Sequence, residues 1–448
     1  MSKRVLVIGA ARSGLAAVDF LQKHDWEVIL TDMKPVEETD VLAHLQALDV
    51  QMIWGEQPDV QELSPELIVI SPGIPLTIPP AVTARGLGIP IINETELAFW
   101  SAKAPFVAIT GTNGKTTTTT LVGELLKDGQ RQVVVGGNIG LPLVSVAESL
   151  SDNDVIVAEM SSFQLETAVS FKPKVAVMLN LTPDHLDRHG DMQGYLEAKA
   201  KIFANQEETD YLVLNADDSY LAPLAERARS QVIFFSQQHI LKEGVFLRGD
   251  KIVFSRGGQE TSICEKQEIA IKGAHNLENA MAAVAAAMLM GVTPAHIREV
   301  LMTFAGVEHR LEPVRRWHGV LFINDSKGTN PDSTIKALEA YAEPLILIAG
   351  GKNKGSDFTT LAQLIAKRVK QVILIGQAKE DLRQALEACG YQHYVMAETY
   401  NEAVQLAAEA AEAGDIVLLS PACASWDMFN SYEERGKLFK KLVNELVE

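Results

Sequence analysis

The chain has 448 residues, 47% hydrophobic and 22% charged, as in a folded globular protein of roughly three domains. Its 40 Lys and Arg against 58 Asp and Glu leave a formal net charge of −18, which argues against wrapping nucleic acid or lying on an anionic membrane, because both need a basic surface. Three distant cysteines, Cys264, Cys389 and Cys423, indicate neither a disulfide framework nor a zinc site, so a reducing cytoplasm is expected.

Short apolar runs alternate with helical patterns along the chain. The strand-like runs are residues 5–9, 28–31, 67–71, 106–110, 155–159, 175–180, 211–215, 320–324, 345–349, 372–376 and 416–420. Continuous Val, Ile and Leu runs between helices predict parallel sheets covered on both faces. The predicted fold class is therefore α/β, in several doubly wound units. Between residues 234 and 270 a short alternating pattern predicts antiparallel hairpins instead.

The rhythm restarts at Glu94, where a new helix begins, and after Gly306. These restarts predict three domains: a Rossmann-like domain at 1–93, a central domain with a mostly parallel sheet at 94–306, and a Rossmann-like domain at 307–448. The longest apolar stretch, 280–292, is about 13 residues and too short to span a bilayer. It predicts a buried, Ala-rich helix.

The first glycine motif, GAARSG, follows the first strand. It places Gly9, Ala11 and Gly14 in the layout of a dinucleotide fingerprint, with Asp32 after the second strand to take ribose hydroxyls. Ala11 replaces the glycine that lets a backbone approach pyrophosphate, which disfavours a plain NAD site but not a nucleotide-shaped ligand. The SPG turn at 71–73 ends a further strand, and is equally a simple turn.

The second motif is AITGTNGKTTTTTLVGELL at 108–126. A strand leads into glycines, then Lys115 and Thr116, and then a helix. The backbone amides of such a loop cradle phosphate, the lysine neutralises the β and γ phosphates, and a hydroxyl reaches Mg²⁺. The spacing departs from the strict GxxxxGK[ST] form, because position 109 is Ile and the first glycine is Gly111. Strand and helix context nevertheless favours a nucleotide site over a chance glycine turn.

Acidic and histidine residues follow two later strands, where α/β sheets bind their ligands. Glu159 could hold a metal against phosphate or could be a carboxylate beside a helix N-terminus. The DHLDRH segment at 184–189 could supply ligands or form a capped, solvated loop. Lys199 and Lys201 lie two apart on a helix and cannot share a face, and by themselves both are expected on the surface.

The last third carries HNLEN at 275–279, whose amides could read a base edge or cap the helix, and cations after strands or hinges. These cations are Arg310, Lys327 within INDSKGTNP, and Lys354 within GGKNKGSDF. Together they suit phosphate and carboxylate ligands, whereas singly each suits an exposed charge. In SPACASWDMF, Cys423 is predicted to be a small buried apolar residue.

The motifs together resemble the Mur ligases of peptidoglycan synthesis over essentially the whole chain. In order they are GTNGKTT, EMSSFQ, DHLDRH, HNLEN, HR, NDSKGTNP, GGKNKG and SPACASWDMF. The resemblance implies ATP-dependent amide ligation through an acyl phosphate, with UDP-N-acetylmuramoyl-L-alanine and D-glutamate as small-molecule substrates. It also implies a cytoplasmic monomer that binds no nucleic acid and does not insert into a membrane.

The resemblance assigns ligand roles by position. ATP would contact Gly111, Thr112, Asn113, Gly114, Lys115, Thr116, Thr117, Asn276, Asn279, Arg310, Asp325 and Lys327. The UDP part of the substrate would contact Ser13, Asp32, Lys34, Ser71 and Gly73, and its muramyl part Asn138 and Gln164. Lys327, Thr329, Lys354, Ser425 and Tyr432 would surround D-glutamate or the transferring phosphate.

The resemblance also implies a catalytic set of Lys115, Glu159, His185 and Lys199. Two Mg²⁺ ions would be held by Thr116, Glu159, His185 and Lys199, the last as an N6-carboxylysine that supplies an oxygen ligand. His185 and a phosphate oxygen are both candidates for the base that deprotonates the incoming amine.

Three other functions compete with this prediction. A nicotinamide-dependent oxidoreductase built on the first unit is disfavoured by Ala11. A P-loop switch that hydrolyses ATP slowly is disfavoured by the cations at several strand ends of the last third. A folylpolyglutamate-type ligase shares the phosphate loop but lacks the SPACAS and NDSK segments.

Overall fold

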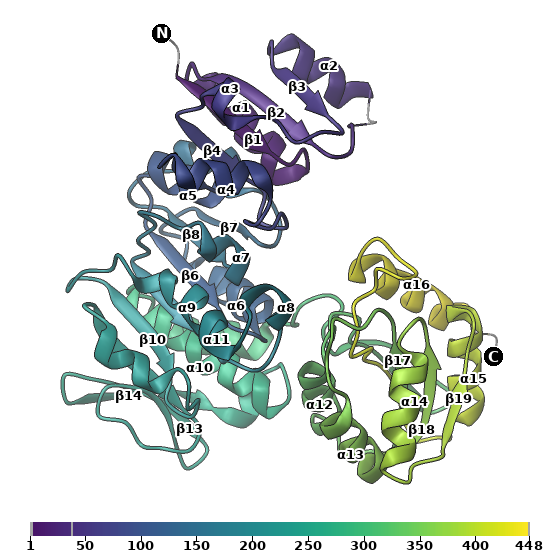
Figure 1. The fold of residues 1–448 in the computed structure, drawn as a ribbon. Helices are drawn as coiled ribbons and strands as arrows, with labels where there is room; N and C mark the ends of the chain where they lie inside the picture. Colours follow the sequence, from purple (N-terminus) through teal and green to yellow (C-terminus); the bar gives the residue numbers. More distant parts are fainter. Residues whose placement is uncertain (1–2, 37–38, 447–448) are drawn as a thin grey trace. The chain divides into compact units, whose positions relative to one another are not determined.

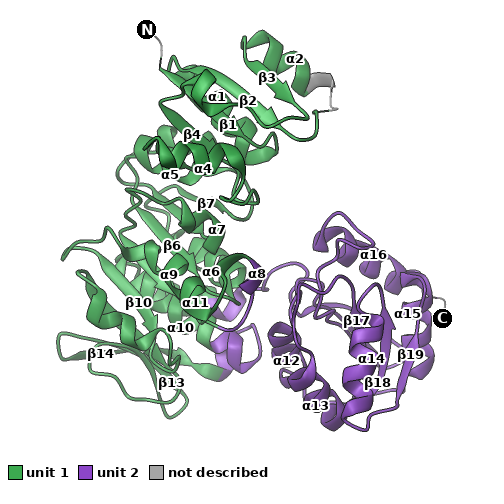
Figure 2. Cartoon of the chain, viewed as in Figure 1, with its two compact units in different colours: residues 1–181, 188–266, 278–300 green, residues 182–187, 267–277, 301–448 purple. Residues whose placement is uncertain are grey.

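The computed structural model describes residues 3–36 and 39–446 and contains three sheets, one within each predicted domain (Figure 1). The predicted α/β class is confirmed. Chain contacts divide the molecule into two compact units, drawn in Figure 2: unit 1 is residues 1–181, 188–266 and 278–300, and unit 2 is residues 182–187, 267–277 and 301–448. The boundaries of the three predicted domains stay a prediction.

The first sheet is wholly parallel, with strand order β3-β2-β1-β4-β5. Its strands are β1 (Arg4–Ile8), β2 (Glu27–Asp32), β3 (Gln51–Trp54), β4 (Leu67–Ile70) and β5 (Ile91–Ile92). Its helices are α1 (Arg12–Lys23), α2 (Thr39–Ala47), α3 (Val60–Leu63), α4 (Pro79–Gly86) and α5 (Glu94–Ser101). The strand order reverses between β1 and β4, so the loops after these strands meet at the switch point where such sheets bind ligands.

The second sheet has the order β14-β13-β12-β11-β10-β9-β6-β8-β7. Its strands are β6 (Phe106–Thr110), β7 (Val133–Gly137), β8 (Val155–Glu159), β9 (Val175–Met178), β10 (Tyr211–Asn215), β11 (Gln231–Ser236), β12 (Gly244–Arg248), β13 (Lys251–Arg256) and β14 (Gln259–Glu265). Strands β12, β13 and β14 pair antiparallel with one another, which confirms the predicted hairpins within 244–265, and the other pairs are parallel. At 234–236 the prediction is wrong, because these residues end β11, which pairs parallel with β10 and β12.

Helices follow the parallel strands of this segment. The α-helices are α6 (Lys115–Leu126), α7 (Ser162–Glu166), α8 (Leu186–His189), α9 (Met192–Ala200), α10 (Ala274–Leu289) and α11 (Pro294–Thr303). The 3-10 turns are η1 (Leu143–Ser145), η2 (Ala147–Ser149), η3 (Lys201–Phe203), η4 (Ala222–Arg227) and η5 (Lys266–Glu268). In α10 the run from Ala280 to Ala287 is fully buried, as the apolar stretch predicted.

The third sheet has the order β15-β16-β20-β17-β18-β19, parallel except for the β15–β16 hairpin. Its strands are β15 (Glu312–Trp317), β16 (Val320–Asn324), β17 (Leu345–Gly350), β18 (Val369–Ile375), β19 (Tyr394–Met396) and β20 (Ile416–Leu419). Its helices are α12 (Pro331–Glu339), α13 (Thr359–Arg368), α14 (Lys379–Ala388), α15 (Tyr400–Ala410) and α16 (Tyr432–Asn444).

The hydrophobic cores are distributed unequally. One core of unit 1 is continuous from the first sheet into the second, because β1, α1 and α5 share it with β6, η1 and β9. The third sheet instead has a core on each face, and both are built from residues between 311 and 446. Within the part of the chain described, no helix is both long and apolar enough to cross a membrane.

Candidate active site

The phosphate-binding loop joins β6 to α6 as the motif predicted. Gly114 has φ 82, a left-handed conformation that glycine adopts without strain, and α6 begins directly after it. Asn180, which follows β9, holds the loop: the Asn113 amide donates to its Oδ1 at 2.8 Å and the Thr112 amide to its carbonyl at 3.0 Å. Sequence reasoning missed Asn180, although a polar residue just past a buried strand end was the available signal.

Two lysines meet at this loop. Lys115 Nζ donates to the Gly111 carbonyl at 2.9 Å, and Lys199 Nζ donates to the same oxygen at 2.8 Å. Lys199 is 1% exposed and its ammonium lies 4.5 Å from the centre of the Tyr195 ring. The surface position expected for Lys199 from its helix alone is therefore wrong, because α9 turns this face toward the phosphate loop. Lys201, two residues later, is exposed as predicted.

A buried carboxylate lies beside the start of α6. Glu159, at the end of β8, accepts a hydrogen bond from Thr116 Oγ1 at 2.8 Å and another from the Asn138 side-chain amide at 2.8 Å. Hydroxyl and carboxylate oxygens are ligands that Mg²⁺ prefers, so Thr116 and Glu159 fit such an ion. Within residues 3–36 and 39–446, no three or more His, Cys, Asp or Glu side chains gather as a metal site. The predicted four-residue ligand set, with its modified lysine, stays a prediction.

Gln164 caps its own helix. Its side-chain oxygen accepts from the Ser161 amide at 2.9 Å, while Ser161 Oγ accepts from the Gln164 amide, which together form a capping box at the start of α7. The predicted contact of Gln164 with the muramyl group stays a prediction.

The HNLEN motif opens α10. Asn279 lies so close to the phosphate loop that a β-carbon on Gly114 would be 2.2 Å from its Oδ1. The Asn276 side chain donates to the Lys272 carbonyl at 2.8 Å. Burial, together with the nearby charge of Arg310, lowers the pKa of His275 to about 3, so that imidazole is neutral.

The DHLDRH segment turns at His185, whose φ of 54 is left-handed. Within unit 2, His185 lies beside Asp184, and Asp184 Oδ1 lies 3.2 Å from Lys354 Nζ. The last two residues of the segment lie in unit 1, where Arg188 and His189 both contact Glu166. Glu159 belongs to unit 1 and His185 to unit 2. The contacts described for the Glu159 carboxylate are Thr116 and Asn138, both in unit 1.

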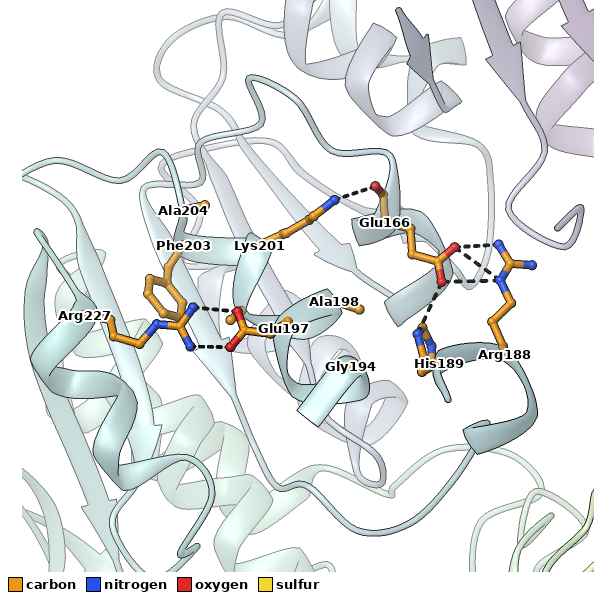
Figure 3. Close-up of a pocket in the computed structure, with 11 residues that line it drawn as sticks. Glu166, Arg188, His189, Gly194, Glu197, Ala198, Lys201, Phe203, Ala204 and Arg227 are labelled. Atoms are coloured by element: carbon orange, nitrogen blue, oxygen red, sulfur yellow. Dashed lines mark hydrogen bonds and ion pairs between the residues drawn. The ribbon is translucent and has the colours of Figure 1, made fainter. Parts of the chain in front are cut away.

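A pocket of about 600 Å³ is lined in part by Glu166, Arg188 and His189, and none of its lining residues belongs to the predicted site (Figure 3). Its charged lining is paired, because Arg188 faces Glu166 and Arg227 faces Glu197. The complete lining is Glu166, Arg188, His189, Gly194, Glu197, Ala198, Ala200, Lys201, Phe203, Ala204 and Arg227.

The amino-terminal motif forms a tight βα turn. Asp32 Oδ2 accepts from the Ala10 amide at 2.8 Å and its Oδ1 from the Lys34 amide at 3.0 Å. A β-carbon on Gly14 would be 1.8 Å from the Gly9 carbonyl oxygen, so the fingerprint glycine is needed for close packing.

The turn after β4 faces this motif at the switch point between β1 and β4. Ser13 Oγ and Ser71 Oγ lie 3.4 Å apart, and Gly73, two residues after Ser71, is exposed. The structure therefore brings Ser13 and Ser71 together.

Asp325 is fully buried and forms an ion pair with Arg310. Its carboxylate accepts from Arg310 Nη1 at 3.3 Å and from Ser420 Oγ at 2.8 Å, and burial raises its pKa. Lys327 Nζ donates to Tyr432 Oη at 2.8 Å. The Thr329 amide donates to the Lys327 carbonyl at 3.0 Å, which closes the NDSKGT turn.

The loops after β17 and β20 pair with each other. Lys352 and Ala424 exchange backbone hydrogen bonds of 2.8 and 3.0 Å, which places the GGKNKG and SPACAS segments side by side. Ser425 and Cys423 are buried, which confirms the predicted burial of Cys423, and this burial raises the Cys423 pKa to about 12.

Arg435, at the start of α16, was missed by sequence reasoning. It is fully buried and donates to the Ser326 carbonyl at 2.7 Å and the Cys423 carbonyl at 3.2 Å. It thereby ties the NDSK loop to the SPACAS loop. The available signal was an arginine in the helix that follows the SPACASWDMF motif, because that helix must pack on the sheet.

Three family models match successive parts of the chain. A model described as Mur ligase MurD-like, N-terminal domain matches residues 3–93, Mur ligase middle domain matches 109–287, and Mur ligase, glutamate ligase domain matches 309–423.

Curated relatives match over the full length. The chain is 53% identical to UDP-N-acetylmuramoylalanine--D-glutamate ligase of Pelotomaculum thermopropionicum, covering 99% of this chain and 98% of the relative. It is 48% identical to the protein of that name from Desulfitobacterium hafniense strain Y51, covering 98% and 97%.

Solved structures share the fold at lower identity. The MurC structure from Thermotoga maritima has a TM-score of 0.60 at 20% identity and covers 99% of each chain. A MurF structure from Acinetobacter baumannii has a TM-score of 0.63 at 17% identity, covering 98% of this chain and 93% of that one.

Proposed function

The chain belongs to the Mur ligase family, and from this premise we propose that it is the ATP-dependent ligase that adds D-glutamate to UDP-N-acetylmuramoyl-L-alanine in peptidoglycan synthesis. The observation that carries the proposal is full-length similarity, at 53% identity, to a relative named for this reaction. A phosphate loop backed by a buried carboxylate, Glu159, supports it independently.

The chemistry requires an activated carboxylate, because a carboxylate is a poor electrophile. The L-alanyl carboxylate oxygen attacks the γ-phosphorus of ATP and ADP leaves, which produces an acyl phosphate. The D-glutamate amine then attacks the acyl carbon, the carbon–oxygen bond to phosphate breaks, and the amine loses a proton. Lys115 and the N-terminus of α6 reduce the repulsion between the attacking carboxylate and the γ-phosphate.

Mur ligases use ATP together with Mg²⁺, and we propose that this chain binds two Mg²⁺ ions. Bound Mg²⁺ neutralises phosphate charge. The residues proposed to hold these ions are Thr116, Glu159, His185 and Lys199, the last as an N6-carboxylysine.

The crowding at Gly111 supports the lysine modification. Two ammonium groups, those of the half-buried Lys115 and the buried Lys199, contact one carbonyl oxygen at 2.9 and 2.8 Å. Like charges so placed repel strongly at low dielectric, and conversion of one ammonium to a carbamate replaces that repulsion by attraction. In ¹³C-bicarbonate, we expect a carbamate ¹³C resonance that the Lys199→Ala variant lacks, and its absence from the wild-type protein would contradict the modification.

The remaining substrate contacts are proposed by position. Ser13, Asp32, Lys34, Ser71 and Gly73 bind the UDP part, and Asn138 and Gln164 the muramyl part. Asn276, Asn279, Arg310, Asp325 and Lys327 bind the nucleotide. Thr329, Lys354, Ser425 and Tyr432, with Lys327, surround D-glutamate. We further propose a cytoplasmic monomer without a nucleic-acid partner.

The deciding assay measures phosphate release from ATP with Mg²⁺ and UDP-N-acetylmuramoyl-L-alanine. D-glutamate should stimulate release, whereas L-glutamate, L-lysine and D-alanyl-D-alanine should not. Equal stimulation by another amino acid would reassign the specificity within the family. Phosphate release that no amino acid stimulates would favour the slow ATPase switch instead.

A further inference from the structure

Four consecutive polar residues, Asn93-Glu94-Thr95-Glu96, are buried where the first sheet ends and α5 begins. A buried polar side chain is costly unless it is hydrogen-bonded. Here most partners lie at least 50 positions later in the sequence, in the loops of the second sheet. Figure 1 shows α5 between these two sheets within unit 1. The segment therefore begins α5 and also hydrogen-bonds to loops of the second sheet.

Glu94 holds the loop that follows Asn138. Its Oε2 accepts from the Val144 amide at 3.2 Å, and the amide of Leu143 also bonds this carboxylate. These amides open η1, directly after the 138–142 loop. The other end of that loop is fixed by Glu159, whose carbonyl accepts from the Asn138 amide at 2.9 Å. The Glu94 carboxylate thus anchors the far end of the loop that presents Asn138.

Asn93 and Thr95 hold the helix that carries Gln164. The Asn93 side-chain amide donates to the Gln164 carbonyl at 2.6 Å and to Thr167 Oγ1 at 2.7 Å, at the end of α7. Thr95 Oγ1 accepts from the Gln164 side-chain amide at 3.4 Å. The oxygen of the Asn93 amide caps α5 itself, accepting from Thr95 N at 2.8 Å. One side chain therefore joins α5 to α7.

Glu96 binds the chain that leaves α7. Its carboxylate accepts from three successive backbone amides, those of Val169, Ser170 and Phe171, at 3.0, 2.6 and 3.2 Å. Three consecutive amides directed at one anion form an anion-binding nest, filled here from within the protein. The Trp100 indole donates to the same carboxylate at 3.1 Å.

We propose that Asn93–Glu96 is a positioning segment that sets the geometry of Asn138 and Gln164, and so couples the packing of the first sheet to capture of the muramyl group. It rests on the proposed function, because these two residues are the proposed muramyl contacts. None of the four side chains touches substrate in this proposal. Their effect is transmitted through η1 and α7.

The test compares Glu94→Ala with Glu94→Gln in the full-length enzyme. The alanine leaves the Leu143 and Val144 amides without an acceptor and should raise the KM for UDP-N-acetylmuramoyl-L-alanine about tenfold, with the KM for ATP changed by less than about twofold. In the wild type the Thr95 hydroxyl donates to Glu94 Oε1 at 3.1 Å. In Glu94→Gln this hydroxyl can accept from the new amide nitrogen instead, which leaves the glutamine oxygen as the acceptor for Val144, so this variant should restore the wild-type KM. Amide hydrogen exchange at 143–144 should accelerate in the alanine variant alone.

Two controls separate positioning from general damage. Lys23→Ala removes an exposed 2.6 Å ion pair to Glu148, close to the same loop, and should leave both KM values unchanged. Leu6→Ala opens a cavity on the face of the first sheet opposite α5. It should lower the melting temperature without raising the KM for UDP-N-acetylmuramoyl-L-alanine relative to the KM for ATP. If Glu94→Ala does not fold, Glu96→Gln, with faster exchange at 169–171, replaces it.

Equal rises in both KM values, or no restoration by glutamine, would overturn the proposal. So would unchanged exchange at 143–144 in a folded alanine variant. Failure of the proposed function has a different signature, because the wild-type enzyme itself would then show no D-glutamate-stimulated turnover while the exchange data remained interpretable.

Discussion

At the scale of single residues, the site concentrates charge inside a protein whose net charge is −18. Lys115 and Lys199 share one carbonyl oxygen, and Glu159 is buried beside Thr116. Arg310 is paired to a fully buried Asp325. Anionic substrates would be bound by these focused groups and by helix N-termini, because the net negative charge of the chain by itself repels anions.

Removal of the Lys199 side chain should nearly abolish catalysis. Lys199→Ala takes away the proposed carbamate oxygen ligand, and we expect kcat to fall at least ~100-fold with a far-UV spectrum like that of the wild type. Lys201→Ala, on the exposed face two residues later, is the matched control and should keep near-normal kcat. Near-normal turnover by Lys199→Ala would contradict the proposed role.

Glu94 should make stability depend on pH. Burial raises the pKa of Glu94 from 4.5 to about 7, so between these values the folded protein binds a proton that the unfolded chain does not. The unfolding free energy should therefore fall as pH rises through this window, by up to ~3 kcal/mol, and then level off. Denaturant unfolding of the wild type and of Glu94→Gln at about pH 5 and about pH 8 measures this fall in unfolding free energy. The glutamine variant should not show it, because its side chain does not titrate. An equal pH response of both proteins would refute it.

At the scale of elements, strand ends and their loops carry the site. The phosphate loop lies between β6 and α6, Glu159 ends β8, and Asn180 follows β9, which are neighbouring strands of the second sheet. Parallel strands bring these ends to one edge although they are far apart in sequence. The same rule places the loops after β17 and β20 side by side in the third sheet.

Glycine is required at the start of α6. A β-carbon at Gly114 would combine a φ of 82 with a 2.2 Å approach to Asn279 Oδ1. Gly114→Ala should therefore raise the KM for ATP at least about tenfold, as the loop and Asn279 move apart. Gly86→Ala is the comparison, since nothing lies within 4 Å of the added methyl group in α4. Steady-state kinetics and thermal melting distinguish the two, and an unchanged KM for ATP in Gly114→Ala would be inconsistent with this geometry.

At the scale of the whole molecule, folding autonomy follows the distribution of the cores. The two cores of the third sheet use residues 311–446, whereas the first sheet shares a core with the second. A domain with its own core can fold alone, and a segment that lends half of a core cannot.

Residues 307–448 expressed alone should therefore unfold cooperatively on heating, with a far-UV signal of mixed helix and strand. Residues 1–93 alone should lack a cooperative transition, because α1 and the first sheet would expose the surface that now packs on β6 and η1. Circular dichroism of the two fragments decides this, and a cooperative melt of the shorter one would show that its own core suffices.

Much of this architecture was predictable from the sequence. Central strands such as β1, β6 and β17 are continuous apolar runs because both faces are covered, and the phosphate loop and HNLEN were legible as motifs. Five edge strands were missed: β3, β5, β7, β15 and β19. Strands β3, β15 and β19 are half-exposed and carry mixed residues, β5 has two residues, and β7 ends in two glycines.

Local sequence therefore determined the fold class, the phosphate loop and the helix starts, since each depends on residues within one turn or one strand. Only tertiary packing decided that Lys199 is buried at the phosphate loop and that Arg435 joins the NDSK and SPACAS loops. It also decided that the side chains of Asn93–Glu96 hydrogen-bond to η1 and α7. The physical reason is that hydrogen bonding of a buried polar group depends on partners brought close by the sheet order, at sequence separations that no local pattern records.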